Sequence, residues 1–168
     1  TAATGGGNPY KVYTPYWKKV KDRPIEPIAE PDFDSLKFPD TYPQTLALDS
    51  LGLLPEKQWY RKFDEYWVVS EAAAQKGLDK FLSQAVEAYN QARDIPSEDG
   101  TSSLSPYLHW GLIGPRQVMH ALKAKHDLGK EGPQVYAKEI YWREFAYNVL
   151  YHFPKTPAAP PYEKYADR

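Results

Sequence analysis

The sequence predicts a mainly α-helical protein in which a long proline-rich connection precedes a helical domain. Two stretches, residues 70–92 and 132–154, carry apolar side chains close to the spacing of an amphipathic helix. Residues 24–55, by contrast, hold too many prolines for a long regular helix; these are Pro24, Pro27, Pro31, Pro39, Pro43 and Pro55. The 168 residues allow one ordinary domain or pieces of two.

The composition excludes several classes of protein. The chain has no cysteine, which excludes a disulfide framework and thiolate metal sites and fits a reducing compartment, so we expect a cytoplasmic protein. No apolar run is long enough to cross a membrane, and no signal-peptide pattern is present. The formal net charge of −1 gives no overall nucleic-acid signature, so any DNA binding must use a local patch. Aromatic residues make up 15% of the chain, which suits stacking surfaces or a bulky core.

The first 23 residues predict a loop followed by a short basic helix. Three glycines at 5–7 lack the Gly-Lys-Ser/Thr that completes a phosphate-binding loop, so we interpret them as an ordinary loop. Residues 10–13 alternate and allow a short strand or an extended segment. Thr14 and Pro15 predict a helix start, with a capping residue followed by a first-turn proline. The lysines that follow predict a solvated face, and phosphate contact is the alternative.

The proline-rich stretch predicts an ordered linker with single helical turns at most. It is longer than an ordinary connection within a compact domain, so we expect it to cross a domain surface and join two domains. The chain begins at Thr1 and ends at Arg168, just after the prolines 157, 160 and 161. From these ends we expect a piece of a longer protein.

Residues 70–92 predict one helix, with Ser70 as its N-terminal cap and Glu71 near the positive end of the helix dipole. An apolar stripe runs along it; it consists of Leu78, Phe81, Leu82, Ala85, Val86 and Tyr89. The segment 93–96 ends this helix.

Residues 99–106 predict a hydroxyl-rich loop that becomes a helix. Gly100 permits a tight turn, and Pro106 suits the first helical turn. Free amides and hydroxyls at such a start favour an anion site; the hydroxyls belong to Thr101, Ser102, Ser103 and Ser105. Any Ser/Thr-rich helix cap shows the same local chemistry, which leaves a purely structural alternative. Gly114 and Pro115 then predict a further helix.

Residues 132–154 predict a helix that starts near Pro133 and stops at Pro154. Glu139, Trp142 and Arg143 lie at positions i, i+3 and i+4, so an acid, a large ring and a guanidinium share one side. Tyr136 precedes them by one turn and Ala146 follows by one turn. Such a set suits a planar ligand with polar edges. The alternative is an ordinary Glu139–Arg143 ion pair, worth about 0.3–0.5 kcal/mol, beside a core tryptophan.

These stretches together resemble the DNA photolyase/cryptochrome family. The matching segments, in order and spacing, are Glu98–Leu108, Gly114–Val118 and Glu139–Phe145. Residues 8–18 resemble the place where the family's antenna domain passes into its linker. The resemblance covers nearly the whole chain, and several motifs in register are more specific than any one of them.

The resemblance implies a chain in three parts. Residues 1–23 would be the end of an α/β antenna domain, 24–69 the interdomain linker, and 70–168 the N-terminal part of a helical FAD-binding domain. The family's flavin-contacting positions correspond to Tyr89, Thr101, Ser102, Leu104, Ser105 and Arg143. Glu139 and Trp142 correspond to the positions that hydrogen-bond and stack on a flipped-out pyrimidine dimer. Tyr136 stands where a tryptophan is frequent and could still stack.

The sequence departs from the family pattern in some places. Lys138 stands where an asparagine is frequent, and Ala146 where a tyrosine is often found. The family's Asn and Asp near the isoalloxazine ring, its tryptophan chain for flavin reduction and most of its antenna pocket fall outside this sequence.

The function that the resemblance implies is light-dependent DNA repair, most like that of a class I cyclobutane pyrimidine dimer photolyase. FAD would supply the electron, and a folate or deazaflavin would serve as a second chromophore. The partners would be dimer-containing DNA and the remainder of the same polypeptide, in a monomer. The alternatives are a cryptochrome without repair, which the Glu139/Trp142 pair disfavours, and an inert helical scaffold. The repair hypothesis requires the loop near 101 and the helix face near 142 to border a single cavity.

Overall fold

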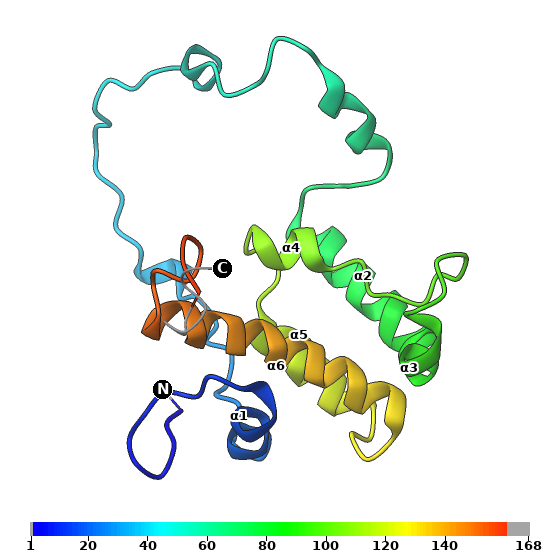
Figure 1. The fold of residues 1–168 in the computed structure, drawn as a ribbon. Coiled ribbons are helices and arrows are strands. Elements are labelled where there is room, and N and C mark those ends of the chain that lie inside the picture. The colour runs from blue at the N-terminus through cyan, green and yellow to red at the C-terminus, as the bar shows by residue number, and fades with distance from the viewer. Residues whose placement is uncertain (1, 161–168) are drawn as a thin grey trace.

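The described structure is helical, as the sequence predicts. The computed structural model describes residues 2–160; Thr1 and residues 161–168, which include Pro161 and the end of the predicted third segment, lie outside the described residues. Within that range there is no β-strand, only an isolated antiparallel bridge between Ala3 and Pro9. The α-helices of the described range are α1 (Tyr13–Val20), α2 (Glu71–Gln84), α3 (Tyr89–Ala92), α4 (Ser105–His109), α5 (Pro115–Lys125) and α6 (Glu131–His152) (Figure 1).

Three of the predicted helix starts are confirmed by their caps. The Ser70 Oγ accepts a hydrogen bond from the Ala73 N–H at 3.1 Å, which satisfies a first-turn donor of α2. Pro106 lies in the first turn of α4. Gly114 caps α5, and its N–H donates to the Gln117 Oε1 at 2.6 Å. Short-range sequence signals therefore set these three boundaries.

The predicted start of the first helix is wrong by two residues, because Thr14 as the cap would place the first helical residue at Pro15. Helix α1 begins at Tyr13 with Val12 as its cap, and no side chain caps it. The reason is tertiary, because Tyr13 is buried and its hydroxyl donates to the Lys138 carbonyl of α6 at 2.9 Å. Residues 10–12 form no strand.

The predicted single helix over 70–92 is also wrong. It breaks at Ala85 into α2, a 3₁₀ turn η4 (Val86–Ala88) and α3. The start of α6 packs directly on the break: a Cβ on Gly132 would lie 2.3 Å from the Glu87 carbonyl oxygen and 2.4 Å from that of Val86. Only glycine allows this approach of two backbones.

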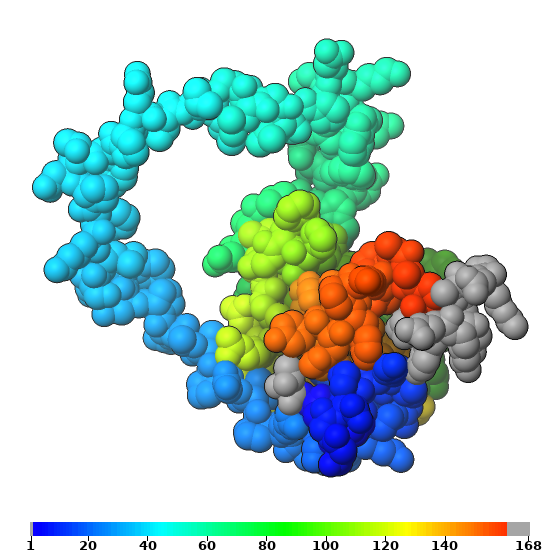
Figure 2. Space-filling model, turned by 60° about the vertical axis from the view of Figure 1, so that its left-hand side comes forward, coloured from blue at the N-terminus to red at the C-terminus, as the bar shows by residue number. Residues whose placement is uncertain are grey.

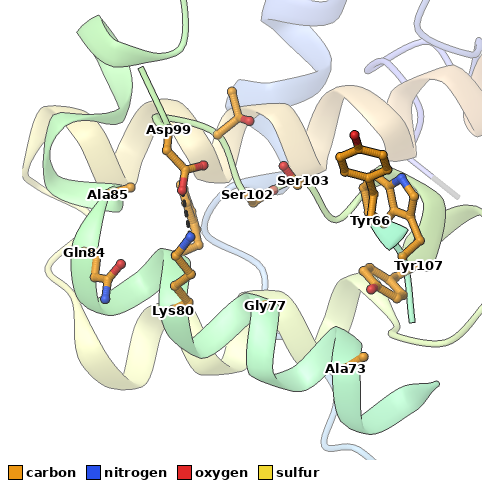
Figure 3. A pocket seen from close by; sticks show the side chains of 13 residues that line it. Tyr66, Ala73, Gly77, Lys80, Gln84, Ala85, Asp99, Ser102, Ser103 and Tyr107 are labelled. Carbon is orange, nitrogen blue, oxygen red and sulfur yellow. Dashed lines mark hydrogen bonds and ion pairs between the residues drawn. The ribbon is translucent and has the colours of Figure 1, made fainter. Parts of the chain in front are cut away.

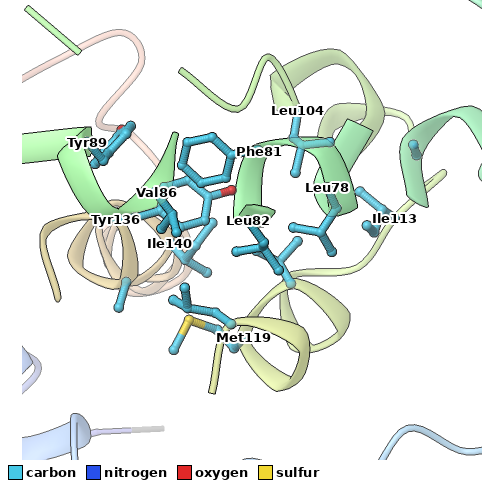
Figure 4. Packing of buried hydrophobic residues seen from close by; sticks show 14 residues of the cluster. Leu78, Phe81, Leu82, Val86, Tyr89, Leu104, Ile113, Met119, Tyr136 and Ile140 are labelled. Carbon is cyan, nitrogen blue, oxygen red and sulfur yellow. The ribbon is translucent and has the colours of Figure 1, made fainter. Parts of the chain in front are cut away.

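The main hydrophobic core lies where α2, η4 and α3 meet α5 and α6 (Figure 4). Its fully buried aliphatic side chains come from α2, η4, α5 and the loop before α4; they are Leu78, Leu82, Val86, Leu104, Val118 and Leu122. A second cluster joins α1 to the C-terminal half of α6. Helix α6 is therefore common to both clusters.

The proline-rich linker arcs away from the helices (Figures 1 and 2). Every residue from 26 to 59 is exposed, and the segment's regular structure is limited to three 3₁₀ elements, η1 (Phe33–Ser35), η2 (Leu48–Leu51) and η3 (Trp59–Glu65). The expectation of single helical turns is confirmed within the proline-rich stretch by η1 and η2, which have three and four residues, whereas η3 follows that stretch and is longer than one turn at seven residues. The linker is fixed at one end by Glu26, which pairs with Arg116 of α5 at 3.2 Å.

Candidate functional site

The hydroxyl-rich loop has an unusual backbone. Ser103 has a φ of 50°, the one non-glycine residue with positive φ among the described residues. Left-handed backbone at a residue with a Cβ is strained and persists where the surroundings fix it. Leu104, which is 1% exposed, anchors the loop in the core below, and the Ser102 Oγ accepts from the Leu104 N–H at 3.4 Å. The loop is therefore held in a shape that a free turn would rarely adopt.

A cavity of about 530 Å³ lies between this loop and α2 (Figure 3). Thr101, Ser102 and Ser103 form one wall, and aromatic side chains line the cavity as well; these are Tyr66, Trp67, Phe81 and Tyr107. The Lys80 Nζ and Asp99 Oδ2 form an ion pair at 2.7 Å that lines the cavity. Hydroxyls, an ammonium and rings are chemically suited to a nucleotide-like ligand.

Glu139 pairs with a residue that the sequence analysis missed. The Arg93 Nη1 donates to the Glu139 Oε1 at 2.5 Å, and the pair is about two-thirds buried. The hydrogen bond to Glu139 raises the pKa of Arg93. Arg93 also lies over the Tyr89 ring, 5.3 Å from its centroid. The structural alternative of a Glu139–Arg143 ion pair is therefore wrong, since both side chains bond elsewhere.

Arg143 contacts α4 instead. Its Nη2 donates to the Leu108 carbonyl at 3.3 Å and to the Tyr147 hydroxyl at 3.2 Å, and its Nη1 pairs with Glu144 at 3.1 Å. Leu108 lies one turn after Ser105, the first residue of α4. The guanidinium is therefore next to the helix that the hydroxyl-rich loop opens.

Tyr136 and Tyr89 lie in the core. Their rings meet edge to face with centroids 5.1 Å apart, and both contact Phe81. Burial raises the pKa of Tyr136 to about 12, and the neighbouring Ser102 hydroxyl partly offsets this rise. The Tyr136 Oη is buried and has no hydrogen-bond partner among the described residues.

Trp142 is not the core residue of the structural alternative. It is 45% exposed, and its ring stacks on Tyr13 of α1 with centroids 3.7 Å apart and an interplanar angle of 12°. It also lines an apolar cavity of about 400 Å³ together with Ala146. Burial, followed by the charge of Glu139, raises the pKa of Tyr13, so the acid and the ring of Trp142 share this neighbour.

Contacts connect several of the predicted residues. Tyr136 contacts Tyr89, and Tyr89 lies beneath Arg93, which pairs with Glu139. Trp142 stacks on Tyr13, whose pKa the charge of Glu139 helps to raise. The expectation of a single cavity is wrong for the described residues: the cavity beside the loop is lined by Thr101 and Ser102 but not by Glu139 or Trp142, which line no part of it. The loop and the α6 residues are neighbours instead through α4, whose Leu108 carbonyl accepts from Arg143.

Arg93 could have been noticed in the sequence. It stands four residues after Tyr89, at the end of a helix, but nothing local indicates that its partner lies 46 residues further on. No group of three potential metal ligands occurs among the described residues. None of the described helices is long and apolar enough to span a bilayer.

The fold is that of the helical domain of photolyases. A solved structure of a bacterial class III photolyase from Agrobacterium tumefaciens matches with a TM-score of 0.81 and 35% identity, over 94% of this chain and 33% of that one. The curated deoxyribodipyrimidine photo-lyase of Agrobacterium fabrum is 38% identical over 161 residues, which are 90% of this chain and 32% of the relative. The enzyme of the same name from Synechococcus is 35% identical over 94% of this chain and 34% of its own length.

The chain belongs to the photolyase family. It spans about a third of the length of the curated relatives it matches. No family model matches the sequence. The solved neighbour is a class III enzyme, so the resemblance to class I stays a prediction.

Proposed function

We propose that the natural polypeptide carrying this sequence repairs DNA by splitting cyclobutane pyrimidine dimers in blue light. The observation that carries the proposal is the placement of the Arg93–Glu139 pair and the exposed Trp142 on one side of α6. On the same helix, Arg143 donates to the Leu108 carbonyl of α4, the helix that the hydroxyl-rich loop opens. The relatives named deoxyribodipyrimidine photo-lyase support it. Residues 1–23, 24–69 and 70–168 would be the end of the antenna domain, the linker and part of the FAD-binding domain.

The residues near the loop suit a flavin nucleotide. Thr101, Ser102 and Ser105 offer hydroxyls and amides, and the strained Ser103 holds these groups in a fixed arrangement. Arg143 adds a cation beside α4. Leu104 would contribute through its backbone because its side chain is buried, and Tyr89 would contribute an edge of its ring. A folate or deazaflavin chromophore would bind elsewhere in the polypeptide.

The residues on α6 suit a base edge. Arg93 holds one oxygen of the Glu139 carboxylate, Oε1, so Oε2 can accept a hydrogen bond from a pyrimidine N–H. Trp142 offers a stacking surface, a contact worth about 1–3 kcal/mol per base in single-strand binders. To reach these groups the lesion would flip out of the DNA base stack, as target bases do in enzymes that carry out chemistry on a base. When bound and reduced, FAD supplies the electron that opens the dimer and recovers it afterwards.

The test is repair of a thymine-dimer oligonucleotide by the natural polypeptide carrying this sequence. With FAD bound and reduced, we expect blue light to restore thymines, and no repair in the dark, as measured by chromatography of the oligonucleotide. Trp142→Ala should weaken binding of the dimer about 5- to 150-fold. Trp110→Ala is the matched control, because Trp110 is an exposed tryptophan of the α4 end that stands outside the proposed site. Absence of repair under these conditions refutes the proposal.

A further inference from the structure

The sequence motifs do not predict the contact between Tyr13 of α1 and Trp142. Tyr13 covers one face of the indole ring in a near-parallel stack, at 3.7 Å between centroids. A side chain that is 45% exposed would otherwise be free to change rotamer in water. The stack therefore restricts the orientation of a ring whose orientation matters for stacking on a base.

Tyr13 is itself fixed from several directions. Its hydroxyl donates to the Lys138 carbonyl at 2.9 Å, and the ring of Phe145 meets its edge at 5.8 Å. Trp17, one turn further along α1, lies parallel to it at 6.5 Å. Only 8% of Tyr13 is exposed. A buried and hydrogen-bonded ring is a rigid support, because neither its position nor its tilt can change without breaking these contacts.

We propose that Tyr13 is a positioning residue for lesion recognition: it holds the Trp142 ring so that its uncovered side is presented to a pyrimidine. The inference rests on the proposed function of Trp142. A support of this kind lowers the loss of side-chain freedom on binding, which raises affinity without any new contact to the ligand. The N-terminal segment, which the family resemblance assigns to a different domain, thereby contributes to the site on α6.

The expected size of the effect follows from the contact. Aromatic pairs contribute beyond their buried area, and losing such a pair corresponds to about a 2- to 12-fold change in an equilibrium constant. Tyr13→Leu should therefore weaken dimer binding by about this factor. Tyr13→Phe keeps the ring and loses only the hydroxyl, so its dimer affinity should stay close to that of the wild type.

The experiment combines ring order with binding. The Trp142 indole N–H is followed by ¹H–¹⁵N NMR, with its signal assigned by Trp142→Phe, and affinity is measured for oligonucleotides with and without a thymine dimer. Tyr13→Leu should shift and broaden the indole signal and reduce the preference for the dimer, while Tyr13→Phe restores both. Tyr10→Leu is the matched control, because Tyr10 meets Tyr16 edge to face at 6.1 Å in the same cluster.

The outcomes separate this inference from the proposed function. A lost dimer preference with an unchanged indole signal overturns the positioning role, as does an unchanged preference with a disordered ring. Equal losses in Tyr13→Leu and Tyr10→Leu show a general packing effect and also overturn it. If the wild type has no preference for the dimer, the proposed function of Trp142 fails, and the positioning role in recognition fails with it. The NMR arm then still reports whether Tyr13 orders the ring.

Discussion

The Arg93–Glu139 pair should contribute measurably to stability, unlike the exposed pairs around it. Glu139→Gln and Arg93→Met each remove one charge, and the double variant completes a cycle that isolates their interaction. The two side chains are 31% and 37% exposed, and their hydrogen bond is 2.5 Å long. Hydrogen bonds to charged groups contribute about 1.5–3 kcal/mol, whereas fully exposed pairs contribute about 0–1 kcal/mol. We therefore expect a coupling of about 1–2 kcal/mol.

The assay is urea and thermal unfolding followed by circular dichroism. A loss of this size lowers the Tm by about 2–8 °C in a chain of this length. Because the pair is partly solvated, the coupling should shrink as salt is raised from 0.05 to about 1 M.

The control is Asp99→Asn, which breaks the Lys80–Asp99 pair. Its side chains are 60% and 73% exposed, so the expected loss is below about 0.5 kcal/mol. Equal losses at the two pairs, or additive effects in the Arg93–Glu139 cycle, would refute the reasoning.

Two further predictions concern the break between α2 and α3. Gly132→Ala should lower the free energy of unfolding by about 3 kcal/mol, because the added Cβ would overlap backbone oxygens. Gly5→Ala is the control and should leave the free energy of unfolding unchanged, because nothing lies within 4 Å of a Cβ at that position. Chemical denaturation of both variants measures the difference. The His126 hydrogen bond, and then Lys130, lower the pKa of Glu87 below its ordinary value of 4.5. The stability that Glu87 contributes is fully present above pH 4.5 and is lost as pH falls through its folded-state pKa. The free energy of unfolding should therefore fall with pH in this acid range more steeply for the wild type than for Glu87→Gln. Identical acid profiles would contradict it.

Local sequence signals predicted a helix start correctly where nearby residues determine that start. Ser70, Pro106 and Gly114 act on backbone groups within four residues of themselves, so their helix starts could be predicted. The break at Ala85 could not, because it accommodates the backbone of α6, which approaches through Gly132. Periodicity alone extends the helix through that point.

In the candidate site, too, the local features were predicted from the sequence and the long-range contacts were not. The shared side of Glu139 and Trp142 follows from helical spacing, and the Ser/Thr-rich segment between Gly100 and Pro106 indicated the hydroxyl-rich loop. The partners of these residues, Arg93 and Tyr13, come from distant elements, and the i, i+4 rule favoured Arg143 as the partner of Glu139. Pairing across helices depends on how the helices pack, which no short spacing in this sequence encodes.

The exposed arc of residues 26–59 leaves α1 attached to α6 by side-chain packing rather than by its neighbours in the chain. Backbone continuity then acts mainly as a tether, which keeps the two surfaces at a high effective concentration. After a protease cuts within the arc, the two fragments should stay associated through the stacked rings and the buried tyrosines. They should separate only when the cleaved protein is diluted.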